Sequence, residues 1–516
     1  GGPAQARKED EVSLGYTLEN LLTYSKSFGN SNLRITGLQS IQALSEEETW
    51  LQGSQLPYES QLWEQLGTSN LTNFGTGKEE WQLASFMGRV NYDIAGKYLI
   101  QVSGRTDGSS RLAPGNQWAF FPGVSVGWRV IDEGFMQGGN FFQDLKLRAS
   151  YGVVGNTSID PYQTQGALQR VPYVFGNTAA FGYRLNAISN PELTWEKTAT
   201  LDIGVDFAFL AGRIEGSFDW YRANTTDLLL RRQLPPTSGF GSVLENVGAT
   251  RNTGIVIALH TVNIDSENGF RWSTDVNWFR NKEEIVELFN GEDDDVGSGW
   301  FIGQPIRVFY DYEKIGIWQI NEEEEAKRYN EFPGEIKRRD VNGNGQFDGD
   351  DRVILGTDVP DWSAGLTNRF EYKGIDLSIF LFARMGHMLR SNLHTGQNSL
   401  FGRYNNLNVD YWTPTNPTNA FPRPNQDQES AKNASTMQYF DGGYVKLRNV
   451  TLGYSFPSSV AEKMGMGSFR VYLSAQNPLF WAKYDTYDPE AGDDAEVEPG
   501  DIPNTKLILG GVNLSF

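Results

Sequence analysis

Polar and apolar side chains alternate with a period of two along almost the whole chain of 516 residues. Between residues 86 and 94, for example, Val90 and Tyr92 fall on one face while Arg89 and Asn91 fall on the other. Successive side chains of a β-strand point to opposite faces, whereas a helix repeats about every 3.6 residues. The alternation therefore predicts an all-β chain whose strands are apolar on one face and polar on the other.

The composition suits a sheet that separates an oily environment from a wet one. Aromatic residues make up 13% of the chain, with 14 Trp, 22 Tyr and 31 Phe, and there are 56 Gly. A helix that crosses a membrane needs about 18 consecutive apolar residues, and the sequence contains no such run. A membrane-spanning role would therefore rest on strands, as in outer-membrane barrels.

Charge and cysteine content exclude several classes of function. The formal net charge is −20, which argues against nucleic-acid binding because a phosphate-binding face needs clustered Lys and Arg. The acidic runs at 322–325 and 490–501 are predicted to be solvated loops. The chain has no cysteine, so disulfides, thiolate catalysis and cysteine metal sites are excluded.

The alternation predicts about fifteen strands. A slip of its phase near Arg448 and Asn449 predicts a β-bulge within the strand at 443–456. The predicted strands lie near 16–28, 32–43, 82–94, 98–108, 118–131, 144–154, 194–209, 213–228, 247–262, 270–282, 361–373, 375–388, 443–456, 468–480 and 505–516.

The connections between these strands alternate between two classes. The short ones lie near 29–31, 95–97, 132–143, 210–212, 263–269, 374 and 457–467, and the long ones include 44–81, 155–193, 283–360, 389–442 and 481–504. Outer-membrane barrels have short periplasmic turns and long extracellular loops, and a soluble sandwich has neither. We therefore predict a transmembrane antiparallel β-barrel with a periplasmic C-terminus and extracellular long segments.

The predicted strands do not complete such a barrel. Bacterial single-chain barrels have an even number of strands, so an odd number does not close in the usual antiparallel way. The chain begins Gly1-Gly2-Pro3, with neither an initiator Met nor a secretion signal. Residues 1–516 are therefore expected to be the C-terminal portion of one barrel, with at least one further strand upstream. Aromatic residues near strand ends are expected in its interfacial girdles, with core packing as the alternative for each: Trp118, Trp128, Tyr98, Trp195 and Trp220.

Several segments are similar to one family. Residues 88–111 resemble its paired strands that end in an Arg-x-Asp-Gly-Ser-Ser turn, and 190–198, NPELTWEKT, match its Asn-Pro-x-Leu-x-Trp-Glu-x-Thr entry. The segments 444–454, 475–479 and 487–490 are also similar, and the terminal Phe516 resembles the aromatic end that outer-membrane assembly recognises. On these motifs the chain resembles the barrel of the SusC/RagA-type TonB-dependent outer-membrane transporters of Bacteroidota.

This resemblance implies a location and a role. It implies a multi-pass protein of the Gram-negative cell outer membrane, with a barrel of about 22 strands. About seven of those strands, a TonB box and a plug domain would lie outside this chain. The implied function is import of a large nutrient, an oligosaccharide or glycan rather than a peptide, driven through the TonB complex. A SusD-like surface lipoprotein is the implied partner, in a dimer of transporter–lipoprotein pairs, and neither enzymatic activity nor an organic cofactor is expected.

Two other functions remain open for a barrel of this kind. One is a secretion- or motility-associated complex, and the other, less favoured, is a barrel enzyme with a Ser/His or paired-acid site on neighbouring strands. Ser125 lies in a Gly-x-Ser-x-Gly pattern, but within a predicted strand that no helix follows. His260, His387 and His394 have no metal-ligand spacing in common.

One motif, at 340–351 within the long loop 283–360, has the spacing of a calcium-binding loop. It reads DVNGNGQFDGDD, with oxygen donors at positions 1, 3 and 5, Gly at position 6 and a carboxylate at position 12. The alternative is an Asn/Gly-rich turn that binds nothing. The predicted Ca²⁺ ligands are the side-chain oxygens of Asp340, Asn342, Asn344, Asp348 and Asp351 and the backbone carbonyl of Gln346.

Aromatic residues of the long loops are candidates for contact with cargo. Packing of the loops against each other is the alternative for each of them. They are Trp50, Trp63, Tyr173, Phe175, Trp300, Phe301, Tyr404, Tyr411 and Trp412. No residue is assigned to the substrate.

Overall fold

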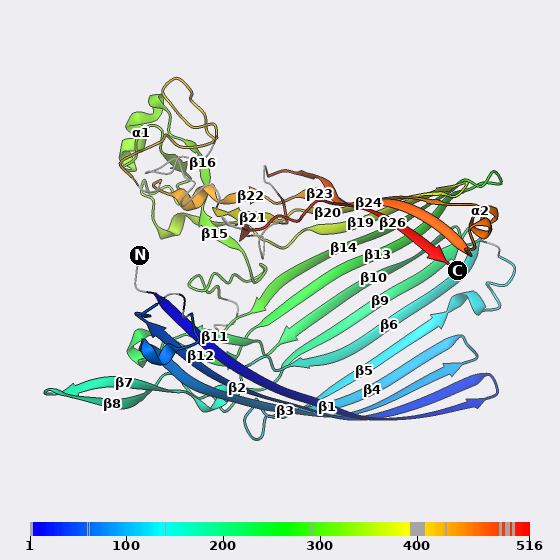
Figure 1. Cartoon of the computed structure of the whole chain (residues 1–516), viewed down its shortest axis with the longest axis horizontal. Helices are drawn as coiled ribbons and strands as arrows, with labels where there is room; N and C mark the ends of the chain where they lie inside the picture. Colours follow the sequence, from blue (N-terminus) through cyan, green and yellow to red (C-terminus); the bar gives the residue numbers. More distant parts are fainter. Residues whose placement is uncertain are drawn as a thin grey trace.

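The computed structural model describes residues 4–58, 60, 62–139, 141–289, 291, 293–392, 408–428, 431–484, 488–490, 496–497 and 501–516. Its main feature is one antiparallel sheet of 15 strands, in which the strands follow one another in chain order (Figure 1). The strands are β1 (Gln5–Phe28), β2 (Ser31–Ser54), β3 (Asn70–Ile94), β4 (Tyr98–Ser109), β5 (Trp118–Arg129), β6 (Phe142–Asn156), β9 (Glu196–Phe209), β10 (Ile214–Thr226), β13 (Ala249–Asp265), β14 (Arg271–Glu287), β19 (Trp362–Tyr372), β20 (Ile375–Met385), β23 (Tyr444–Ser455), β24 (Ser468–Ala482) and β26 (Leu507–Ser515).

Each predicted strand is present, and the sheet curls into a wall with β1 and β26 at its two edges (Figure 1). The predicted bulge is confirmed, because the register of β23 slips between Leu447 and Asn449 against β24 and at the matching point against β20. Among the described residues no helix is long and apolar enough to cross a membrane, and α1 (Glu323–Arg328) and α2 (Ser458–Lys463) have 6 residues each.

The prediction of a loop at 44–81 was wrong, because most of this segment forms strand. β2 continues to Ser54 and pairs with β1 without interruption. β3 starts at Asn70 and pairs with β2, with one irregularity of the register near Gly53. A tilted strand needs about 9–11 residues to cross a bilayer, so these strands of 24 and 25 residues extend well beyond one. Outside lipid both faces meet water, so the alternation disappears from the sequence while the backbone ladder continues.

The short and long connections lie at opposite ends of the sheet, as predicted (Figure 1). The short ones end on the side of the C-terminus, and the two-residue turn between β19 and β20 shows how tight they are. Its Gly374 has φ +85°, and a Cβ there would lie 2.5 Å from the carbonyl oxygen of Ser455. Glycine is required at this position because another residue would be strained and would clash.

Several long connections contain small sheets that the sequence analysis did not predict. They are built from β7 (Leu168–Phe175) and β8 (Thr178–Leu185), β11 (Leu229–Gln233) and β12 (Ser242–Asn246), β15 (Phe309–Tyr312) and β18 (Arg352–Gly356), β16 (Lys314–Ile317) and β17 (Ile336–Arg338), and β21 (Met388–Ser391) with β22 (Tyr439–Asp441) and β25 (Glu496–Val497).

The two faces of the wall differ in chemistry, and the register fixes which residues share a face. Val102 of β4 lies between Val90 and Val124 of the neighbouring strands on the outer face, and it is 53% exposed. Gln101, on the inner face, lies between Asn91 and Ser125. Apolar side chains are thus exposed in rows on the outside, an arrangement that suits contact with lipid rather than with water.

Aromatic residues gather at the short-connection end of the outer face. The hydroxyl of Tyr98 and the indole N–H of Trp128 both donate to Glu133, at 2.6 and 3.1 Å, and these hydrogen bonds lower the pKa of that carboxyl. Phe141 stacks on Phe209 nearby. Rings with an apolar body and a polar tip suit a membrane–water interface, which supports the girdle expected for Tyr98 and Trp128. The same prediction was wrong for Trp195, which is buried against Phe121, and Trp220 lies in the middle of β10.

The outer face can be tested with two arginine substitutions at adjacent positions. Val102→Arg places a charge among lipid-facing side chains, which costs about 2–4 kcal/mol near the bilayer midplane. Gln101→Arg places the same charge on the polar inner face. We expect Val102→Arg to reduce the amount of complete protein that is folded in outer membranes, measured as the heat-modifiable form. Gln101→Arg should leave this amount unchanged. An equal loss for both variants would contradict this assignment of the faces.

Candidate functional site

The inner face of the wall carries ion pairs that bridge neighbouring strands. Arg148 of β6 lies 2.8 Å from Asp206 of β9 and 2.8 Å from Asp219 of β10. Gly204 stands between Arg148 and Asp219 in the register, and a Cβ there would lie 2.1 Å from the Asp219 carboxylate. The glycine therefore leaves the space through which the two charged side chains meet across β9.

Similar pairs continue along the same face. Asp275 of β14 contacts His260 of β13 at 2.6 Å and also pairs with Arg369 of β19. Arg470 and Asp376 form another such pair, at 2.5 Å. A hollow of about 780 Å³ lies against the inner faces of β1 to β6 and β9. This wall is lined by charged and amide side chains, and it suits water, a polar cargo or a polar protein surface.

The described parts of 288–361 and 386–443 pack together into a unit that we call the loop module. Its core is a cluster of Ile317, Ile336, Trp412, Ala431 and Met437. The indole N–H of Trp412 donates to the side chain of Gln319 at 2.9 Å, so this residue joins the two loops. Phe301 is also buried. For these two candidate aromatics the structure shows packing, and Tyr404 lies outside the described residues.

A buried glutamate also ties the two loops together. Glu331 is 0% exposed and accepts hydrogen bonds from the indole N–H of Trp318 at 2.6 Å and from the amide of Asn433 at 2.9 Å. Arg338 lies 3.4 Å away and balances its charge. A buried charge is tolerated only when it is paired and hydrogen-bonded in this way. The loop module is therefore held by polar bonds as well as by its small apolar core.

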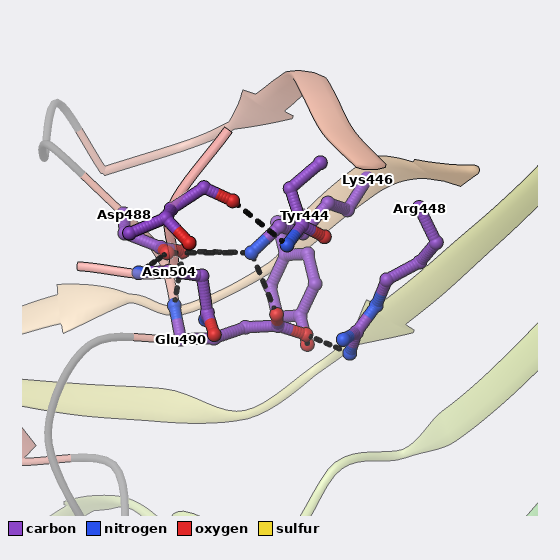
Figure 2. A network of polar contacts seen from close by, with 8 residues as sticks. Tyr444, Lys446, Arg448, Asp488, Glu490 and Asn504 are labelled. Carbon is purple, nitrogen blue, oxygen red and sulfur yellow. Dashed lines mark hydrogen bonds and ion pairs between the residues drawn. The ribbon is translucent and has the colours of Figure 1, made fainter. Parts of the chain in front are cut away.

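A second buried charge network fixes the described parts of the last long connection, 483–506, to the wall (Figure 2). The ammonium of Lys446 lies 2.8 Å from Glu490 and 3.1 Å from Asp488. Arg448 and the hydroxyl of Tyr444 also bind Glu490, and the backbone N–H of Asn504 donates to Asp488. We call this network the loop latch.

The two cations that reach Glu490 are two residues apart in β23, a spacing that places strand side chains on the same face. Arg448 also lies at the bulge, because it is an extra residue in the ladder against β20, where Leu447 and Asn449 pair with adjacent residues. Lys446 and Asp488 are almost completely buried. Burial opposes ionisation of Asp488, but the N–H of Glu490 and the Lys446 ammonium outweigh it and lower the pKa of Asp488.

The predicted calcium motif forms a compact loop in the structure. Asp340 accepts the backbone N–H groups of Gly343 and Gly345, at 2.7 and 2.9 Å. Asn342 accepts the N–H of Asn344, at 2.9 Å, and buried Asp351 accepts those of Val341 and Asp348. Asn344 and Asp348 take part in the same way, through the N–H groups of Gln346 and Asp350.

These contacts decide how well the motif suits a cation. The side-chain oxygens of Asn342 and Asn344 each accept one hydrogen bond and keep a lone pair, as a calcium ligand requires. One oxygen of Asp340 and one of Asp351 already accept two hydrogen bonds each, so these residues would bind an ion through their other oxygens. Burial opposes the ionisation of Asp340, but the N–H of Gly345 and the hydroxyl of Tyr329 lower its pKa overall. Among the described residues, no three His, Asp or Glu side chains gather as a metal cluster. An ion would therefore also need the Asn and backbone oxygens.

The other candidate positions have different surroundings. Ser125 lies within β5, opposite Gln101 and Ser150, and a strand of this kind does not form the strained turn of a nucleophile elbow. Burial lowers the pKa of His387 to about 4, so its ring is neutral at pH 7. His394 lies outside the described residues.

One feature that the sequence analysis missed is the hairpin of β7 and β8, which projects from the rest of the molecule (Figure 1). Phe175 and Tyr183 are 69% and 74% exposed, and Arg170 and Arg184 are its charged residues. The turn at Gly176-Asn177 joins the two strands, with Gly176 at φ +60°. A Gly-Asn pair between two such runs is a known hairpin signal, which would have identified the feature.

Comparison with known proteins places this architecture. Residues 5–477 match the model of a family described as "TonB dependent receptor-like, beta-barrel". The chain is 34% identical to TonB-dependent receptor P26 of Formosa agariphila, over 100% of this chain and 54% of that protein. It is 30% identical to TonB-dependent receptor SusC of Bacteroides thetaiotaomicron, over 91% of this chain and 46% of that protein.

A solved structure agrees with these matches. The RagAB peptide importer in its "open-open" state superposes with a TM-score of 0.83 at 25% identity, covering 99% of this chain and 56% of that one. The chain therefore spans about half the length of the relatives it matches.

The loop latch predicts a local effect of removing its cation. In Lys446→Met the buried carboxylate of Asp488 loses its cation, while Glu490 keeps Arg448, and breaking a buried pair typically costs about 3–5 kcal/mol. We expect segment 483–506 to become sensitive to limited proteolysis in the complete protein. The control is Lys483→Met, which breaks the exposed Lys483–Asp441 pair at 2.7 Å and should change little. Equal cleavage of both variants would show that the latch does not hold the segment.

Proposed function

This chain belongs to the TonB-dependent receptor-like β-barrel family of the outer membrane, and on that premise we propose that the complete protein actively imports a large nutrient. The observation that carries the proposal is the wall itself, which has exposed apolar rows outside and bridged charges inside. Such a wall separates lipid from a polar passage. Its long connections gather at one end, where cargo would be captured.

The energy for import would come through the TonB complex, by way of parts of the protein that lie outside this chain. This step is supported by the family and by the likeness to the SusC- and RagA-type proteins. The mobile element would be the loops, because they are fastened by a few ion pairs and small apolar clusters, whereas the wall is a continuous ladder.

A SusD-like surface lipoprotein is the partner that we propose at the long-loop end. The β7–β8 hairpin is the surface that we assign to it, because both of its faces are exposed and apolar, and its charged residues are two arginines. Exposed aromatic side chains on a projecting element are typical anchors of a protein interface. An acidic, partly apolar patch on the lipoprotein would complement this hairpin.

The nature of the cargo is also a proposal. The resemblance favours an oligosaccharide or glycan, while the RagAB structures are described as those of a peptide importer. Both classes require a polar passage and wide loops, so the inner wall is compatible with either.

We also propose that the motif at 340–351 binds Ca²⁺ and stiffens the loop that carries it. The support is the arrangement of its oxygens around the N–H groups of the same loop, which predisposes the turn to a single conformation. The last ligand, Asp351, is shorter than the bidentate Glu usual at position 12, so a weak extracellular type of site is expected, with a dissociation constant of about 10⁻⁴–10⁻³ M.

The proposed partner predicts a specific loss of association. We expect a surface lipoprotein to co-purify in stoichiometric amount with the complete protein from gently solubilised outer membranes. The double variant Phe175→Ser/Tyr183→Ser should reduce its recovery at least tenfold, because the hairpin loses its two exposed aromatic anchors. Mass spectrometry of the bound fraction measures this.

The control for this experiment is Phe135→Ser, at a residue equally exposed but located in a connection at the opposite end of the wall. It should leave the lipoprotein bound. Unchanged recovery from the double variant would remove the hairpin from the interface. Secretion or motility components in place of a lipoprotein would overturn the import role.

The calcium proposal predicts heat on titration of Ca²⁺ into the calcium-depleted complete protein. Asp340→Asn should lower the affinity at least tenfold, because it removes the first carboxylate of the motif. Asp350→Asn is the matched control, since Asp350 occupies position 11, which supplies no ligand. A titration without heat, or equal effects of the two variants, would favour the turn that binds nothing.

A further inference from the structure

A cleft of about 640 Å³ opens in the loop module, next to the apolar cluster around Ile336, with which it shares Met437. It lies between β18, the link from β15 to β16, and the segment that leads into β22. Volumes of this size are typical of small-molecule sites. Its apolar lining comes chiefly from Val353, Ile354, Leu355, Met388, Met437 and Phe440.

One cationic residue, Lys314, lines this cleft. Its ammonium donates to the backbone carbonyl of Ala420 and lies 5.9 Å from the ring centroid of Phe421. In the described part of the chain no carboxylate pairs with it, because the neighbouring Glu313 is engaged by Arg339 at 3.1 Å. Burial lowers the pKa of Lys314. An ammonium has three N–H donors, and this contact uses one of them.

The surroundings of Lys314 indicate that its charge needs an anionic partner. A charge among apolar groups is costly unless an opposite charge meets it. The chain as a whole carries a net charge of −20 and repels anions, so an uncompensated lysine inside a cleft is a local exception. An anionic group entering the cleft would gain a charge-assisted hydrogen bond to Lys314.

The aromatic residues of the cleft argue against a sugar ring as the rest of the ligand. Tyr312 has the guanidinium groups of Arg338 and Arg352 over its ring, at 4.6 and 5.4 Å. Tyr439 packs against Phe309 and Phe440 packs against Tyr484. Each of these rings thus already packs against a neighbouring group, whereas aliphatic and thioether side chains line the rest of the space.

We propose that this cleft binds a carboxylate carried on an apolar body, as at the C-terminal end of a peptide that finishes in an aliphatic or aromatic residue. Lys314 receives the carboxylate, and the side chains of β18 and the two methionines cover the apolar part. The assignment of this ligand to the cargo rests on the proposed import function. The binding site itself does not.

The test compares two probes that differ only in charge. The probes are N-acetyl-leucyl-phenylalanine as the free acid and the same peptide as its C-terminal amide, titrated into the complete detergent-solubilised protein. We expect the acid to bind at least tenfold more tightly than the amide. Lys314→Met should remove that difference by weakening the acid alone, and Lys314→Arg should retain it.

The control variant is Lys327→Met, at an exposed lysine of α1 that pairs with Glu323 and Glu324. It should leave both probes unchanged. Leu355→Asp offers an independent check, because it places a negative charge in the cleft and should abolish binding of the acid. Thermal unfolding of each variant confirms that the protein is folded.

Equal binding of acid and amide, or no binding of either, would overturn the proposal. Binding of tri-galacturonate with no binding of the acetylated dipeptide would also overturn it, since an acidic sugar lacks the apolar body. These results are separate from the lipoprotein experiment: loss of the import role would leave binding of the dipeptide intact, and failure of the cleft would leave the lipoprotein bound.

Discussion

Every backbone N–H and C=O group that lies in hydrocarbon must be paired within the protein, because lipid offers no hydrogen-bonding partner. The 15-stranded ladder meets this demand, and its register then dictates which side chains face lipid. A shift of one residue would turn every lipid-facing side chain inward. Val102 and Gln101 are adjacent in the chain yet belong to opposite environments for this reason. The backbone pairing therefore fixes one register for the wall, a constraint that the connections do not share.

The wall could be predicted from sequence because its signal is local. Alternation is written into each strand, and the bulge near Arg448 is visible as a slip in that pattern. The signal ends where lipid ends, so the outer halves of β2 and β3 were missed although their ladder continues. The β7–β8 hairpin carried its own turn signal, Gly176-Asn177, which was not used. The calcium motif stays a prediction, since spacing identifies its oxygens but not the ion.

The candidate site could be predicted much less well, because it depends on contacts between distant segments. Lys446 and Asp488 belong to two separate stretches that resemble the family, and nothing in either stretch indicates that they meet. Glu331 and Asn433 come from different loops, and their pairing depends on how those loops fold over each other. Periodicity gives no information on such contacts. The aromatic residues were ambiguous for the same reason, and Trp412 proved to pack inside the loop module.

The loops are joined in a way that suits reversible movement. An apolar core gains free energy mainly in proportion to the area that it buries, whereas a buried ion pair is close to neutral when intact and costly when half broken. Glu331 and Lys446 therefore favour fully docked or fully released loops over intermediate positions. Lys314 differs from both, because its charge lies in a cleft without an acidic partner among the described residues. Glu331 and Lys446 thus hold the loops together, and the charge of Lys314 is left for a ligand to neutralise. In the proposed site, fastening and recognition thus fall to different residues, so a ligand that binds Lys314 would not have to break the pairs that hold the loops.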